Sequence, residues 1–171
     1  MADPILQVAL RALASGTLAG ITTAATAAAA GKREENSYAA PINATSHIVW
    51  GDKAAAQDAA SLKYTLTGFL LNHASAVFWA MFYEKLFGRR RRVLGAKDSL
   101  VKPLLGAAAV SAGAYLTDYY LVPKRFTPGY EKRLSGRSMT AIYGMLALGL
   151  VAYDLIDAAN SSRKVTYPRR S

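Results

Sequence analysis

The sequence of 171 residues contains no cysteine. This absence excludes disulfide bonds, metal sites built on thiolates and cysteine nucleophiles. The sequence also lacks the motifs of phosphate-binding loops, dinucleotide-binding folds, HExxH metalloproteases and GxSxG hydrolases. No residue pattern therefore identifies a reaction.

Charge is scarce over long stretches of the chain. Charged residues make up 19% of the sequence, below the roughly 25% of a typical soluble domain. Residues 62–88 and 104–123 hold few charges, whereas residues 89–102 and 124–137 are basic. A charge at the centre of a spanning helix costs roughly 2.5–3.5 kcal/mol on insertion scales. The alternation of apolar blocks and basic loops therefore favours a membrane protein.

Four apolar segments are each near the roughly 20 residues that cross a bilayer core. We therefore predict an all-α fold, a polytopic membrane protein that forms one four-transmembrane-helix bundle over residues 1–171, with a basic tail at 160–171. The four spans are expected at about 5–30, 64–87, 103–122 and 139–159.

The first segment is the least typical, because it is rich in alanine and threonine and contains Arg11. An alanine-rich soluble helix is the alternative there. Its acidic leading end and long apolar run predict a retained helix and not a cleaved signal peptide.

Small residues recur at every fourth position in three of these segments, and one series contains a Gly-x-x-x-Gly pair. In lipid, where apolar burial gains little, helices associate by close backbone approach at such positions. We therefore predict tight helix packing at Gly16, Gly20, Gly68, Ala76, Ala80 and Gly113.

The longest connection covers residues 31–63. Pro41 suits a first helical turn, and Ile42, Val49 and Trp50 can share one face. We predict a short interfacial helix in this loop, followed by a second helical stretch that leads into the second span. A turn is expected at 127–130, where proline and glycine are adjacent.

The basic run Arg89, Arg90, Arg91 and Arg92 lies within five residues of a span end. The positive-inside bias therefore predicts cytoplasmic N- and C-termini, although the basic residues of the two sides are nearly balanced in number. These arginines are expected to contact anionic lipid headgroups. The net charge of +10 sits at span ends, so no nucleic acid is expected as a partner. The general pattern is that of a bacterial inner-membrane protein.

Several polar residues interrupt the apolar segments. His73 and Glu84 are eleven residues apart, which places them on one face but about 16 Å apart along a helix, too far for one metal site. Other polar residues are Arg11 in the first segment, Asp118 near the end of the third, and Asp154 with Asp157 near the end of the fourth. If helix directions alternate, Arg11 and Glu84 lie at similar height, which predicts an intramembrane ion pair.

The most plausible convergent set is His47, His73 and Asp118, on the opposite side from that ion pair. Two imidazoles and a carboxylate can bind a divalent metal or relay protons. The competing interpretation makes His73 a hydrogen-bonded packing residue, with no cofactor. The other residues expected near this set are Asn43, Asn72 and Tyr115.

The patterns favour a non-catalytic accessory or scaffold subunit that associates, through its small-residue faces, with copies of itself or with a larger membrane complex. One alternative is a small oligomeric transporter or channel with a His/Asp proton or ion site at His73 and Asp118. A second is a metal- or haem-binding membrane enzyme that uses His47 and His73.

Overall fold

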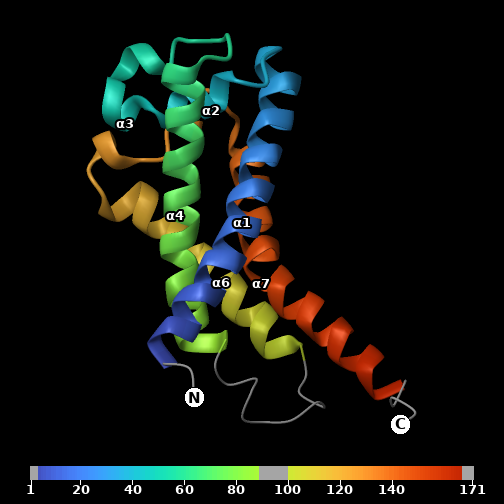
Figure 1. The fold of residues 1–171 in the computed structure, drawn as a ribbon. Helices are drawn as coiled ribbons and strands as arrows, with labels where there is room; N and C mark the ends of the chain where they lie inside the picture. The colour runs from blue at the N-terminus through green and yellow to red at the C-terminus, as the bar shows by residue number, and fades with distance from the viewer. Residues whose placement is uncertain (1–3, 89–99, 167–171) are drawn as a thin grey trace.

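The computed structural model of the chain describes residues 4–88 and 100–166. All secondary structure within these residues is helical, which confirms the all-α prediction (Figure 1). Two of the described helices, over Ile5–Glu35 and Gly136–Ile156, are long and apolar enough to cross a membrane. They support a membrane protein, whereas four spans go beyond what these two helices establish.

Four long helical stretches coincide with the four apolar segments. Helices α4 and α6 are α-helical over 17 and 16 residues. Helix α4 continues in π-helical turns at both ends, and α6 continues in one at its C-terminal end. The four stretches are α1 (Pro4–Glu35), η2–α4–η3 (Leu62–Leu66, Thr67–Tyr83 and Glu84–Gly88), α6–η4 (Val101–Leu116 and Thr117–Leu121) and α7 (Gly136–Thr166). Helix α7 therefore extends into the residues expected to form the tail.

The four stretches run up and down along one another (Figure 1). Helix α1 is the central element and packs along both α4 and α7, while α6 packs mainly on α7. The start of α1, the end of η3 and the end of α7 lie at one end of the bundle, drawn at the bottom of Figure 1. The short helices α2 (Ala40–Thr45) and α3 (His47–Trp50) lie at the other end.

Small residues bring α1 into backbone contact with its neighbours. A Cβ atom on Gly16 would lie 2.5 Å from Val77 Cα of α4, and one on Gly149 of α7 would lie 2.3 Å from Ala19 Cα. Such distances are far below van der Waals contact, so a larger side chain at either position forces the helices apart. The other positions expected to pack helices are also enclosed, namely Gly20, Gly68, Ala76 and Ala80, whereas Gly113 has open space around it.

The first loop departs from the prediction of an interfacial helix. All six residues of α2 are buried between the long helices. Ile42 is buried in α2, while Val49 and Trp50 of α3 are exposed. The prediction that these three residues share one helical face is wrong, because Ser46 separates the two short helices α2 and α3.

The prediction of a second helical stretch in this loop is also wrong. Only η1 (Asp52–Ala54) and η2 are helical between residues 51 and 66. The Asn43 amide Nδ2 donates to the carbonyls of Gln57 (2.9 Å) and Ala59 (3.0 Å), and Thr65 Oγ1 donates to Asn43 Oδ1 (2.6 Å). A buried asparagine thus satisfies backbone groups that a helix would have satisfied internally.

The connection between η4 and α7 contains η5 (Lys124–Phe126) and η6 (Tyr130–Lys132), joined by the turn expected at 127–130. Gly129 has φ +85°, and a Cβ there would lie 2.5 Å from the Ala44 carbonyl oxygen. Glycine is required by both the backbone conformation and the close approach of this turn to α2.

We expect Gly149→Ala to lower the free energy of unfolding by about 1–3 kcal/mol, because the added methyl group overlaps the α1 backbone. Thermal unfolding in mild detergent measures this change. The matched control is Gly136→Ala at the start of α7, where a Cβ meets nothing within 4 Å. Equal unfolding temperatures for the two variants would contradict the close packing of α1 and α7.

Candidate functional site

A buried charge cluster joins three helical stretches near the lower end of the bundle. Arg11 Nε of α1 donates to Glu84 Oε2 at 2.8 Å, and Arg11 Nη2 donates to Asp154 Oδ1 of α7 at 2.6 Å. The Tyr83 hydroxyl donates to Asp154 Oδ2 at 2.6 Å. Both carboxylates have side chains only 1% exposed. One guanidinium therefore neutralises part of the charge of two buried carboxylates.

The geometry of this cluster suits a structural role more than a chemical one. The two hydrogen bonds use separate nitrogens of one planar guanidinium, which fixes its orientation. The Arg11 guanidinium also lies over the Tyr153 ring, 4.9 Å from its centroid. The sequence paired Arg11 with Glu84, and the structure brings these two together. It also adds Asp154, which was noted only for its depth, and Tyr83, for which the sequence held no signal.

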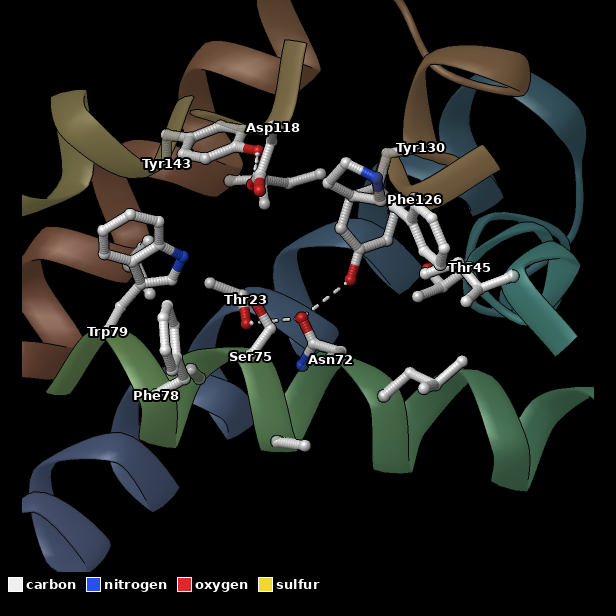
Figure 2. Close-up of a pocket in the computed structure, with 17 residues that line it drawn as sticks. Thr23, Thr45, Asn72, Ser75, Phe78, Trp79, Asp118, Phe126, Tyr130 and Tyr143 are labelled. Carbon is white, nitrogen blue, oxygen red and sulfur yellow. Dashed lines mark hydrogen bonds between the residues drawn. The ribbon is translucent and has the colours of Figure 1, made fainter. Parts of the chain in front are cut away.

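A cavity of about 350 Å³ lies near the other end of the bundle, between α4, η4, the 122–135 connection and α7 (Figure 2). Asp118 stands on its wall, where its Oδ2 accepts a hydrogen bond of 2.6 Å from the Tyr143 hydroxyl. The aromatic residues of the lining are Phe78, Trp79, Phe126, Tyr130 and Tyr143.

Asn72 organises the floor of this cavity. Its Oδ1 accepts hydrogen bonds from the hydroxyls of Tyr130 (2.9 Å) and Thr23 (3.1 Å), and its Nδ2 donates to the Gly20 carbonyl (2.9 Å). Burial raises the pKa of the Tyr130 phenol, so this group stays protonated and donates. The network connects α1, α4 and the 122–135 connection at one level (Figure 2).

The structure does not bring His47, His73 and Asp118 together. His47 is buried beside the turn at Gly129, with Nδ1 2.9 Å from the Ala44 carbonyl oxygen. His73 stacks on Phe69 and faces Gly20 of α1. Neither imidazole lines the cavity that Asp118 borders. Asn72 reaches the cavity and His73 does not, because adjacent residues of a helix point about 100° apart.

No group of three or more His, Asp or Glu side chains within residues 4–88 and 100–166 could hold a metal ion. The proposed ligands His47, His73 and Asp118 therefore do not form a metal centre in the described part of the chain.

The remaining predicted residues have separate positions. Asn43 fixes the first loop, as described above. Tyr115 is partly exposed on α6. The centroid of its ring lies 5.1 Å from that of Tyr119 and 5.2 Å from that of Tyr143. The run from Arg89 to Arg92, expected to contact lipid, lies outside the described residues. The sequence analysis missed the aromatic lining of the cavity, whose rings come from α4, the 122–135 connection and α7.

A second hollow, of about 510 Å³, runs along the outer surface between α6 and α7, and we call it the α6–α7 groove. Gly144 lines it, and a Cβ at this position would meet nothing within 4 Å. Gly113 of α6 is equally open, but it does not line the groove. The groove is lined by Ala108, Ser111, Ala112, Tyr115, Leu116, Thr140, Tyr143, Gly144 and Ala147.

Comparison with known proteins gave no match to a family model, to a curated protein or to a solved structure.

We expect Arg11→Met to lower the free energy of unfolding by about 3–5 kcal/mol, because it leaves two buried carboxylates without a cation. Denaturant unfolding in mild detergent measures this loss. The control is Lys132→Met, which removes an ion pair to the exposed Asp52 and should cost less than about 1 kcal/mol.

Restoring charge balance should recover most of the stability that Arg11→Met removes. The variant that combines Arg11→Met with Glu84→Gln and Asp154→Asn carries no buried charge at these positions. If this triple variant is no more stable than Arg11→Met alone, ion pairing is not what the cluster contributes.

Proposed function

We propose that this chain is a non-catalytic integral membrane protein, an accessory or scaffold subunit that associates with a second copy of itself through the α6–α7 groove. The observation that carries this proposal is the contrast among its glycines. Gly16 and Gly149 are closed against a neighbouring helix within the chain, whereas Gly144, which lines the groove, faces open space.

The proposal treats all four helical stretches as membrane spans. Helices α4 and α6 with their π-helical turns cover 62–88 and 101–121, and at 1.5 Å per residue each reaches across a core of about 30 Å. Large apolar side chains also face outward on all four stretches, which favours contact with lipid over contact with water. Examples are Leu10, Leu13, Ile21, Leu70, Phe78, Met81, Phe82, Leu86, Leu104, Leu105, Leu116, Leu148 and Ile156.

The proposed orientation places both termini in the cytoplasm of a bacterial cell, with the chain in the inner membrane. Both ends of the described chain lie at the same end of the bundle (Figure 1). The basic run at 89–92 directly follows η3, which ends there as well. The positive-inside bias then assigns that end to the cytoplasm.

Association in lipid requires close backbone approach, and the α6–α7 groove allows it. Small residues on both of its walls let an incoming helix approach nearly to backbone distance. The chain uses the same device internally, where Gly16 meets Val77 and Gly149 meets Ala19. A second copy supplies an identical groove, which closes a two-fold interface with the same residues on both sides.

The two alternative functions find less support in the geometry. A transporter that gates ions through His73 and Asp118 needs both groups in one pathway, yet only Asp118 borders the cavity. An enzyme that binds metal or haem through His47 and His73 needs both imidazoles at one centre. These histidines contact different elements, the 127–130 turn and α1.

Disulfide cross-linking tests the self-association, and the cysteine-free chain makes single-cysteine variants unambiguous. We expect Ala112→Cys and Gly144→Cys to form covalent dimers in native membranes at least five times more efficiently than Ile21→Cys. Ile21 is a matched control, because it is exposed on α1 at the depth where Thr22 Oγ1 donates to the Met145 carbonyl.

Gly144→Leu provides the second measurement. It should leave the chain folded, since its Cβ has open space, and should reduce the mass measured by light scattering to that of a monomer, 18.3 kDa. Equal cross-linking at all three cysteines, or a monomeric unmodified protein, would overturn self-association through this groove.

A further inference from the structure

The cavity near Asp118 combines one carboxylate with several aromatic rings. Among the residues that the structure describes, its lining contains a single charged side chain, Asp118, and no Lys, Arg or His. The other polar groups on its wall are the hydroxyls of threonine, serine and tyrosine and the amide of Asn72. The electrostatic character of the cavity is therefore negative.

Asp118, which is half-buried, differs from the buried carboxylates of the bundle. Glu84 and Asp154 both contact the guanidinium of Arg11. In the described chain, by contrast, Asp118 has one hydrogen bond from a neutral phenol and no ion pair. Partial removal of a carboxylate from water without a cation has a free-energy cost, and an incoming cation would compensate for that cost.

The aromatic residues determine which kind of cation fits. Phe78 and Trp79 come from α4, Phe126 and Tyr130 from the connection above it, and Tyr143 from α7, so the rings stand on different sides of one space (Figure 2). Ring faces attract organic ammonium groups, and aromatic cages are the usual sites for quaternary ammonium ions. A bare metal ion would instead need several oxygen ligands around one point.

The size and depth of the cavity restrict the ligand further. A volume of about 350 Å³ lies at the small end of ligand pockets. The 122–135 connection, which carries Lys124 and Arg125, covers part of the cavity through Phe126, Pro128 and Tyr130. Phe78 and Ser75 on its rim are exposed, so a ligand can enter from the side of α4.

From these observations we infer that the cavity binds the ammonium group of a small organic cation, with Asp118 as its counter-ion and the rings of Trp79, Phe126 and Tyr130 around it. The ammonium group belongs either to a free amine or to the choline or ethanolamine headgroup of a lipid. This inference does not rest on self-association, because the linings of the cavity and of the α6–α7 groove share only Tyr143 among the described residues.

The test uses the full chain in maltoside detergent with tetramethylammonium chloride as the probe. The chain has two tryptophans, so Trp50→Phe leaves Trp79 of the cavity as the only fluorescent indole. We expect a saturable change in Trp79 fluorescence when sodium chloride is replaced by the probe at constant ionic strength. No saturable change would overturn the inference.

Two variants establish the site. Asp118→Asn should weaken binding at least tenfold, whereas Asp52→Asn, which removes an exposed carboxylate, should leave it unchanged. Ser75→Leu keeps Asp118 but places a larger side chain at the cavity, and it should abolish binding. This second variant provides the test if Asp118→Asn fails to fold. Binding that survives Ser75→Leu, or that survives Asp118→Asn in a folded variant, would overturn the inference.

The source of the ammonium group is distinguished in lipid nanodiscs. One preparation contains phosphatidylcholine, and the other contains digalactosyl diacylglycerol, a neutral lipid without an ammonium group. A headgroup ligand should compete with the probe and weaken its apparent affinity at least fivefold in phosphatidylcholine. Equal affinity in both lipids would assign the site to a free amine.

Discussion

The close approach of α1 to α4 and α7 is the constraint on which the rest of the structure depends. Apolar burial gains little in lipid, so van der Waals contact must hold the helices together, and this contact is strongest where backbones nearly touch. Gly16 against Val77 and Gly149 against Ala19 provide such contacts on two sides of one helix. Helix α1 thereby sets the distance between α4 and α7.

That spacing leaves the bundle with two distinct polar regions. At the lower end, Arg11 reaches both Glu84 and Asp154, because α1 lies between the helices that carry them. At the upper end, Asn72 connects α4 to α1 and to Tyr130. In the first region both carboxylates contact the guanidinium of Arg11, although Glu84 Oε1 has no hydrogen-bond partner in the described part of the chain. The second region contains a carboxylate without a cation beside an open cavity. This difference is why the ligand inference concerns Asp118 and not the Arg11 cluster.

The outer surface divides in a similar way. The small residues of α1 and α4 are used inside the chain, and those beside the α6–α7 groove are left open. Small residues allow close packing of helices in a membrane, and those of the α6–α7 groove are not used for it within the chain. This is the reason for proposing a second copy there. The cavity and the groove share Tyr143, whose ring contributes to both linings. A ligand near Asp118 therefore lies one residue away from the proposed subunit interface.

The sequence by itself determined the all-α class, the positions of the four apolar segments and the similar height of Arg11 and Glu84 along the bundle. These follow from local patterns, since hydropathy and helical periodicity depend on residues close together in the chain. It did not determine the course of the first loop, because the hydrogen bonds of Asn43 to Gln57 and Ala59 compete with local helix formation.

The convergence of polar residues was decided only by the tertiary structure. Asp154 joins Arg11, and Asp118 joins Tyr143 while both histidines lie elsewhere, because the rotation of each helix about its axis is set by contacts with distant segments. Depth along a helix can be counted from the sequence. The direction in which a side chain points within the bundle depends on which small residues meet across the helices. These contacts join segments that are far apart in the sequence, so a local sequence pattern does not predict them.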